Sequence, residues 1–345
     1  MTGKVTLSDV ARAAGVSLMT ASRAVNGGAD QRRRTPNQQR VVQVAERLGY
    51  VPDASAQAIA RGRTSTLGLI ITDTHDSQIT TAVYDGVAAE ASARGLSVSM
   101  MSAGGDRDQL VARVRDMHRL RVRGLVIAAV DGSDPGHVPG LRTAVDALTR
   151  SGCVVCTLGF ELEGVSAVTL DEREGARSLT AVLVASGYRR PAILAGSPSN
   201  PVHDARSHGL IEGFEQHGLA VEADRVRCSG ERRASAAAET AALLSRADER
   251  PDVIIVVSPS DVSEVLDATR GAGLAVPADV AVAVCGDTNT PTHGGALTRI
   301  LTPWRDASEV AARYAAPEQV GVVTVQRMAL PLRPVASVSK LDGAH

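Results

Sequence analysis

From Thr66 onward, short apolar segments alternate with Ala-rich amphipathic segments, and this alternation limits the possible folds more than any other feature. The apolar segments have the length of strands and are apolar throughout, which is typical of strands buried on both faces of a sheet. Strands that alternate with helices predict a parallel sheet flanked by helices on both sides. The expected strands are LGLIIT, LSVSMM, GLVIAAV, CVVCTLGF, AILAG, VIIVVS and VAVAVC.

At 345 residues the chain is too long for one compact domain of the usual size. We expect residues 64–345 to form a body of two α/β lobes, with the chain crossing between them near residues 158–165 and again near 286–305. Because aromatic residues make up only 2% of the chain, the cores must be built from Ala, Val, Leu and Ile.

The first 63 residues differ from the body in charge. They contain ten Lys and Arg against four Asp and Glu, a net of +6, whereas the remaining residues carry 27 against 34, a net of −7. A basic region on an acidic body indicates a polyanionic partner for the basic region alone. Charge by itself is equally compatible with a disordered basic tail.

Residues 5–26 contain the pattern of two short helices joined by a tight turn. Apolar residues recur at helical spacing from Leu7, with Thr6 or Ser8 placed to cap the first helix, and Gly15 ends it. Ser17 can cap the second helix. This is a helix-turn-helix pattern, in which the predicted packing residues are Val10, Ala14, Val16 and Ala21.

The outward face of the second helix distinguishes this pair from an ordinary helical hairpin. It presents short hydroxyls, one amide, one Arg and two apolar side chains, namely Leu18, Met19, Thr20, Ser22, Arg23 and Asn26. Hydroxyls and amides suit phosphate oxygens, Arg suits the guanine edge, and apolar groups suit the thymine methyl. The composition of this face indicates contact with DNA.

The run T-L-S-D-V-A-R-A-A-G-V-S…T-A-S-R-A-V-N, followed by A-E-R-L-G-Y-V-P-D-A-S-A-Q-A-I-A-R-G, strongly resembles the lactose-repressor (LacI/GalR) family. The resemblance implies an all-α DNA-binding head over residues 1–50 and an α/β two-lobed body like that of periplasmic binding proteins. It implies base-reading positions at Leu18, Met19 and Arg23. It implies phosphate-clamping positions at Thr6, Ser17, Thr20, Ser22 and Asn26.

A third helix is expected from about Asn37, as its cap, to Leu48, with Gly49 ending it. Residues 51–63 follow as a hinge helix or linker, too short to be a stable helix alone. The resemblance implies that this hinge folds over the operator and wedges Ile59, with Ala56 nearby, into the minor groove and kinks the DNA. The alternative is a flexible linker.

The common motifs of α/β enzymes are absent from the sequence. We find no G-x-G-x-x-G after a strand, no G-x-x-x-x-G-K-[ST] and no G-x-S-x-G. His203, His208 and His217 lack the spacing of a zinc-binding helix. We therefore expect no enzyme activity, no cofactor and no metal.

Cys153 and Cys156 form a C-x-x-C inside an apolar, strand-like segment. Without a second such pair, buried thiols are favoured over a redox pair or half of a zinc site. No apolar segment reaches the roughly 18 residues that a membrane span needs, and the N-terminus lacks the apolar stretch of a signal peptide. We expect a cytoplasmic protein without a membrane partner.

The body departs from the family at the positions that commonly anchor the effector. Leu210 stands where an Arg is usual, Ser258 and Pro259 replace an Asn-Asp pair, and Gly286 replaces an Asp. Because sugar sites need such polar anchors, two hypotheses stay open: a different, more apolar ligand, or a cleft with a weakened response. The candidate cleft residues are Asp73, His75, Phe160, Arg206, Ser258, Asp287 and Trp304.

These features predict a sequence-specific DNA-binding regulator, a repressor by family default. It is expected to bind a pseudo-palindromic operator in double-stranded DNA as a homodimer, with a small-molecule effector of unknown identity. The C-terminal segment shows no leucine heptads, so a dimer is expected rather than a tetramer. The alternative is a cytoplasmic small-molecule sensor whose N-terminal helices serve only dimerisation.

Overall fold

The computed structural model describes residues 5–26, 35–51, 64–73, 77–130, 132–229, 235–245, 249–287, 297–317 and 323–333. The chain divides into two compact units, Met1–Ser65 and Thr66–His345. Within the described ranges, no helix has the length and apolar character that a membrane span requires.

The first unit, which we call the head, contains three helices: α1 (Leu7–Ala14), α2 (Leu18–Asn26) and α3 (Pro36–Arg47). Thr6 caps α1 in a reciprocal capping box with Asp9. Gly15 ends α1 with φ +63°, a left-handed conformation that glycine adopts without strain. The small residues Ala14, Ala21 and Ala24 are buried where the helices meet, so the helices pack closely.

Four residues were predicted to pack in the head, and three of them, Val10, Ala14 and Ala21, are buried. Val16 is only partly buried against this core. The start of α3 differs from the prediction, because Thr35 and not Asn37 is its cap. Thr35 forms a capping box with Gln38, and Pro36 occupies the first helical turn, where its missing N–H costs nothing.

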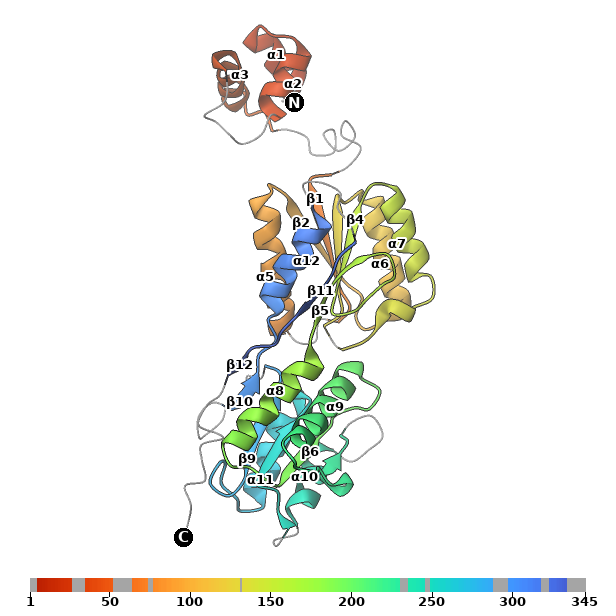
Figure 1. Cartoon of the computed structure of the whole chain (residues 1–345). Helices are drawn as coiled ribbons and strands as arrows, with labels where there is room; N and C mark the ends of the chain where they lie inside the picture. Colours follow the sequence, from red (N-terminus) through yellow and green to blue (C-terminus); the bar gives the residue numbers. More distant parts are fainter. Residues whose placement is uncertain are drawn as a thin grey trace. The chain divides into compact units, whose positions relative to one another are not determined.

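The first lobe of the body is built on a six-stranded sheet in the order β11-β5-β4-β3-β1-β2. All its strand pairs are parallel. The strands are β1 (Thr66–Ile71), β2 (Ser97–Ser102), β3 (Gly124–Ala128), β4 (Val154–Leu158), β5 (Ser166–Leu170) and β11 (Val325–Met328). Helices α5 (Ser77–Ala93) and α12 (Trp304–Ala315) cover one face, and α6 (Arg107–Arg119) and α7 (Leu141–Arg150) cover the other (Figure 1).

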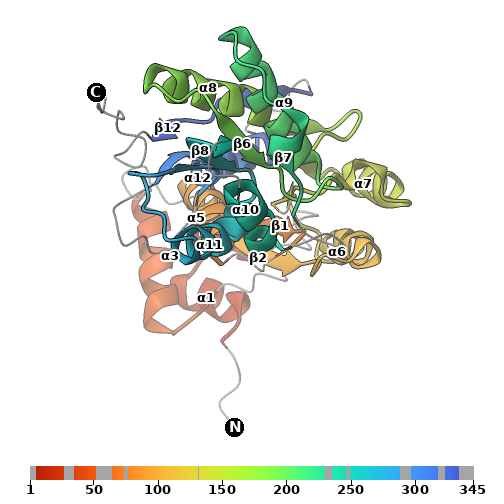
Figure 2. The ribbon, with the colours of Figure 1, turned by 90° about the horizontal axis from the view of Figure 1, so that it is seen from below.

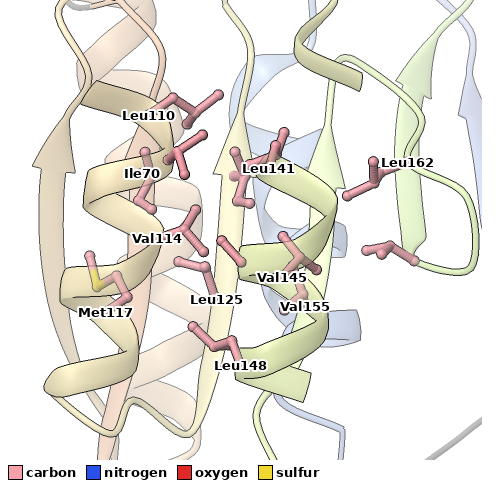
Figure 3. Packing of buried hydrophobic residues seen from close by; sticks show 14 of the residues in the cluster. Ile70, Leu110, Val114, Met117, Leu125, Leu141, Val145, Leu148, Val155 and Leu162 are labelled. Carbon is pink, nitrogen blue, oxygen red and sulfur yellow. The ribbon is translucent and has the colours of Figure 1, made fainter. Parts of the chain in front are cut away.

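Successive residues of β1 supply both cores of this lobe. Leu69 and Ile71 face α5 and α12, while Ile70 faces α6 and α7. Figure 3 shows the second of these cores, in which Leu110, Val114 and Met117 of α6 and the neighbouring α7 side chains pack on the sheet. Burial on both faces explains why the central strands β1, β3 and β4 are almost entirely apolar, whereas the edge strands β2 and β11 are partly exposed and carry polar residues.

The second lobe contains a sheet in the order β12-β10-β9-β8-β6-β7, parallel except for the pairing of β12 with β10. Figure 2 shows α8 and α9 on one face and α10 and α11 on the other. The strands are β6 (Pro191–Leu194), β7 (Val226–Arg227), β8 (Val253–Val256), β9 (Ala281–Cys285), β10 (Thr298–Ile300) and β12 (Leu332–Arg333). The helices are α8 (Glu172–Ala185), α9 (Pro201–Gln216), α10 (Ala236–Leu244) and α11 (Val262–Gly271), with short 3₁₀ turns in the body at Pro135–His137, Ala223–Arg225 and Pro259–Asp261.

The chain passes between the two sheets three times within the described residues: from β5 to α8, from β10 to α12 and from β11 to β12. The predicted first crossing near 158–165 is wrong. The segment 166–170 forms a further strand, β5, beside β4 in the first sheet, so the chain leaves this lobe only after Leu170. The second crossing, at 301–303, lies inside the predicted range, and the third was not predicted. The crossings are joined by backbone hydrogen bonds from Asp171 N to Met328 O and from Leu301 N to Pro331 O.

Candidate functional site

The exposed face of α2 is the first candidate site, and the start of the helix determines which residues it presents. Ser17 Oγ accepts a hydrogen bond from Thr20 N at 3.1 Å, so α2 begins at Leu18. Ala21 and Ala24 then point into the core. With 3.6 residues per turn, Leu18, Met19, Ser22 and Arg23 lie on the opposite side.

Two large apolar side chains on this face are open to solvent. Leu18 is 55% exposed and Met19 is 64% exposed, next to the exposed Arg23. Adjacent exposed apolar side chains on so small a unit indicate a contact surface. The three predicted base-reading residues therefore share one face of one helix.

The predicted phosphate-contacting residues have different surroundings. The Thr6 hydroxyl donates to Asp9 Oδ2 at 2.6 Å, the Thr6 backbone N–H donates to the same oxygen at 3.0 Å, and these two bonds lower the pKa of Asp9. The Thr6 hydroxyl also accepts from Asp9 N. The Ser17 and Thr20 hydroxyls lie 2.9 Å apart and share a hydrogen bond. Ser22 is half-buried on α2. The hydroxyls of Thr6 and Ser17 thus stabilise helix starts in the isolated chain.

Other predicted DNA-contacting groups cannot be placed. Ala56 and Ile59, the predicted minor-groove residues, lie outside the described residues, as does the side chain of Asn26.

The second candidate site is a cavity of about 260 Å³ in the body, which we call the cleft. Residues that follow the carboxyl ends of strands in both sheets line it, the position at which open α/β sheets bind ligands. Its lining comprises Ile79, Ala129, Val130, Gly132, Gly159, Thr169, Leu170, Glu172, Asn200, Val202, His203, Arg206, Ser258, Pro259, Ser260, Gly286, Asp287, Thr302 and Trp304.

Four of the seven predicted cleft residues line this cavity: Arg206, Ser258, Asp287 and Trp304. Phe160 does not. It is buried in the core between α6, α7 and the first sheet, because the loop after β4 stays within the first lobe instead of crossing.

Two further candidates are not placed at the cleft. Asp73 is half-buried but is not among the residues that line the cavity, and His75 lies outside the described residues.

A buried ion pair forms the floor of the cleft. Arg206 Nε donates to Glu172 Oε2 at 2.7 Å, and both side chains are only 8% exposed. Arg206 Nη1 donates to the carbonyls of Cys285 at 2.7 Å and Val257 at 3.2 Å. Burial alone would lower the pKa of Arg206, but the facing Glu172 carboxylate and its hydrogen bond raise that pKa above its ordinary value. Arg206 is therefore a charged clamp that joins α8, α9, β8 and β9.

Gly286 makes room for this clamp. Its φ is +124°, and a Cβ atom there would lie 2.7 Å from Pro259 Cγ and 3.3 Å from Arg206 Nη1. Leu210, one turn after Arg206 on α9, is fully buried in the core of the second lobe. The departures at Pro259 and Gly286 are thus physically linked, because Pro259 and Arg206 fill the space that a side chain at 286 would need.

His203 is neutral at the edge of the cleft. Its Nδ1 accepts a hydrogen bond from Ser197 N at 3.1 Å, and burial together with the nearby Arg206 charge lowers the pKa of His203 to about 4. Because Nδ1 is the acceptor, the ring proton is on Nε2, which serves as a donor.

The sequence prediction missed Glu172 and His203. Glu172 could have been found as the second of the two acidic residues, Asp171 and Glu172, that follow the segment VSAVTL, had that segment been recognised as a strand.

The cysteines of the C-x-x-C do not face each other as a reactive pair. Cys153 packs in the core next to α7, whereas Cys156 packs on the opposite face of the sheet. Burial raises the pKa of each thiol to about 12, so neither is reactive at neutral pH. Among the residues that the structure describes, no three His, Cys, Asp or Glu side chains gather as a metal site would require.

Two family models match the chain. Residues 6–53 match the model of bacterial regulatory proteins, lacI family, and residues 180–335 match that of a periplasmic binding protein-like domain. The chain is 30% identical over 241 residues to maltose regulon regulatory protein MalI of Escherichia coli (strain K12), covering 70% of this chain and 68% of that protein. It is 27% identical over 312 residues to catabolite control protein A of Priestia megaterium, covering 90% and 91%.

Solved structures share the fold. The lac repressor dimer bound to operator and the anti-inducer ONPF matches with a TM-score of 0.76 and 21% identity, covering 98% of this chain and 100% of that chain. The complex of transcriptional regulator CelR with cellobiose matches with a TM-score of 0.64 and 24% identity, covering 96% and 98%.

Proposed function

The chain belongs to the lacI family of bacterial regulatory proteins, and on that premise we propose that it represses transcription from a pseudo-palindromic operator, to which it binds as a homodimer. The chain is a DNA-binding transcriptional regulator and not an enzyme, like its relatives. The face of α2 formed by Leu18, Met19 and Arg23 carries the proposal, since it offers one guanidinium and two apolar groups to base edges.

We assign the base-reading role to these three residues and phosphate contacts to Ser17, Thr20, Ser22 and Asn26. Thr6 joins this second group only if its hydroxyl leaves Asp9 when DNA binds. Two heads on a symmetric site would neutralise several phosphates, so the affinity should fall steeply with salt. We further propose that Ile59 and Ala56 enter the central minor groove, and that the protein acts in the cytoplasm, where it meets DNA.

The homodimer has a candidate surface on the first lobe. Tyr84 of α5 and Met100 of β2 are both more than 40% exposed, and β2 is the edge strand of its sheet. An exposed apolar edge is suited to pairing with a second copy. The lac repressor, which shares this fold, is a dimer on its operator, and this supports the dimeric state that we propose.

Selection of duplexes from a random pool by the full-length protein tests the proposal. We expect an enriched inverted repeat whose half-sites are related by a two-fold axis, as the symmetry of a dimer requires. If the head served only dimerisation, the bound pool would stay random while the protein remained dimeric in sedimentation. That result would rule out a repressor and favour the alternative function, a small-molecule sensor.

A further inference from the structure

The two sides of the cleft differ in chemistry. The first lobe and α12 contribute the apolar side chains of Ile79, Val130, Leu170 and Trp304. The second lobe contributes polar groups, chiefly Glu172, His203 and Arg206. A ligand that satisfies both sides has an apolar body and one polar edge.

The ion pair on the polar side is joined through only one hydrogen bond. Arg206 Nε binds Glu172 Oε2, whereas Glu172 Oε1 and Arg206 Nη2 have no hydrogen-bond partner among the described residues. Both residues line the cleft and keep 8% of their side-chain surface exposed, so we infer that these two atoms face the cavity. The floor therefore offers a hydrogen-bond acceptor beside a donor, and His203 Nε2–H adds a second donor.

The charges of the cleft compensate one another. Glu172 is paired with Arg206, and Asp287 accepts from Thr302 N while lying 3.7 Å from Arg299 Nε. His203 is neutral. An anionic ligand would meet the Glu172 carboxylate without an uncommitted cation, and a cationic ligand would meet Arg206, so either charge would be desolvated at a cost.

The size of the cleft limits the ligand further. A cavity of about 260 Å³ lies at the small end of ligand pockets, which measure roughly 300–1,000 Å³, so it suits one small ring and its substituents. A polyhydroxylated sugar would place hydroxyls against the apolar side without partners, which is unfavourable.

We propose that the effector is a small, uncharged molecule with an amide-type edge, an N–H beside a C=O, that binds Glu172 Oε1 and Arg206 Nη2. Its apolar body packs against Trp304, Ile79 and Val130. This inference rests on the proposed regulatory function and identifies the ligand class of the same body.

Calorimetric titration of the full-length protein with four probes tests the ligand class. Benzamide, benzoate and benzylamine share one ring and differ in the charge of the head, and glucose represents polyols. We expect benzamide to bind in the millimolar range suited to so small a fragment, and at least about tenfold tighter than the other three. Equal or tighter binding of any other probe, or no heat from benzamide up to about 10 mM, would overturn the proposal.

A charge variant tests the role of the ion pair. Glu172→Gln keeps the shape but leaves Arg206 uncompensated, so the preference should invert from benzamide to benzoate. Glu174→Gln is the matched control, because Glu174 lies on the same helix, exposed and paired with Arg177. An unchanged preference in folded Glu172→Gln would contradict the assignment.

Trp304→Leu provides a second test if Glu172→Gln does not fold. It should weaken benzamide and benzoate alike and keep their order, whereas unchanged benzamide binding would contradict the apolar contact. Each preparation is also assayed for selective duplex binding. Selective DNA binding without benzamide binding would refute the ligand class alone, and loss of selectivity in the wild type would refute the regulatory function.

Discussion

The face that we propose to read bases comes from one helix of nine residues, whereas the cleft is lined by eight short segments between Ile79 and Trp304. Leu18, Met19 and Arg23 of α2 are exposed, so each can change without moving the others. In the cleft, Arg206 binds Glu172 and two strand carbonyls, and its guanidinium occupies the space beside Gly286. The residues of a site formed by one helix can be substituted one at a time, whereas in a site formed by distant segments a substitution at one residue disturbs its partners.

The largest expected effect is the loss of stability when the ion pair of the cleft, Glu172 and Arg206, is broken. Glu172→Ala leaves the buried Arg206 guanidinium without its counter-charge and should lower the free energy of unfolding of the body by about 3–5 kcal/mol. Denaturant unfolding followed by circular dichroism measures this loss. The exposed Glu174→Ala should cost no more than about 0.5 kcal/mol. If both variants lowered the free energy of unfolding by the same amount, the Glu172–Arg206 ion pair would not stabilise the body as described.

The second expected effect is a dependence of the free energy of unfolding on pH, caused by His203. The pKa of His203 is about 4 in the folded body and near 6.5 in an unfolded chain, so folding favours the neutral ring. Its contribution is complete above about pH 6.5 and is lost as the pH falls towards 4, at about 1.4 kcal/mol per pH unit. The difference in unfolding free energy between wild type and His203→Gln should shrink over this window. The exposed His208→Gln is the control, and a parallel pH profile for wild type and His203→Gln would rule out the buried neutral ring.

On the head, Arg23→Ala should weaken binding by about 1–3 kcal/mol at one base pair of each half-site and relax the choice of base there. The melting of the head should change little, because Arg23 is exposed. Affinities for a panel of single-base operator variants measure this. A uniform loss over the whole panel would identify Arg23 as a phosphate contact.

The smallest effect separates two roles of one residue. Thr6→Ala removes the cap of α1 and should destabilise the head by about 1 kcal/mol. If Thr6 acts only as a cap, Thr6→Ser should restore the stability, and the affinity for DNA should be the same in all three proteins when each head is folded. A uniform loss of affinity for all duplexes by a folded Thr6→Ala head would instead assign the Thr6 hydroxyl a contact with the DNA backbone.

The sequence supports the prediction of the head and of the lobes because their signals are local. In the head, the apolar residues at helical spacing, Gly15 and the capping hydroxyls lie within one or two turns of each other. In the lobes, the strands that are buried on both faces are recognised by their apolar composition. The predicted cap of α3 was wrong by two residues, since Thr35 and Asn37 both precede the apolar stripe and only the capping box with Gln38 decides between them.

The cleft was predicted less well because its residues meet only through the fold. The strand β5 was not recognised, which displaced the first crossing and hid Glu172. The same error placed Phe160 at the cleft instead of in a core. The loss of the usual anchors at 210 and 286 was visible in the sequence, but the compensating position of Arg206 depends on a contact between α9 and the end of β9.

The most direct test of the account is competition between duplexes for the full-length protein. The selected operator and a random duplex of equal length compete in the presence of bulk DNA, with wild type and with Leu18, Met19 and Arg23 all changed to Ala. We predict a preference of at least about 10³-fold for the operator in the wild type, lost in the triple variant while non-specific binding remains. Equal binding of the two duplexes by a wild-type protein whose head is folded would contradict the account.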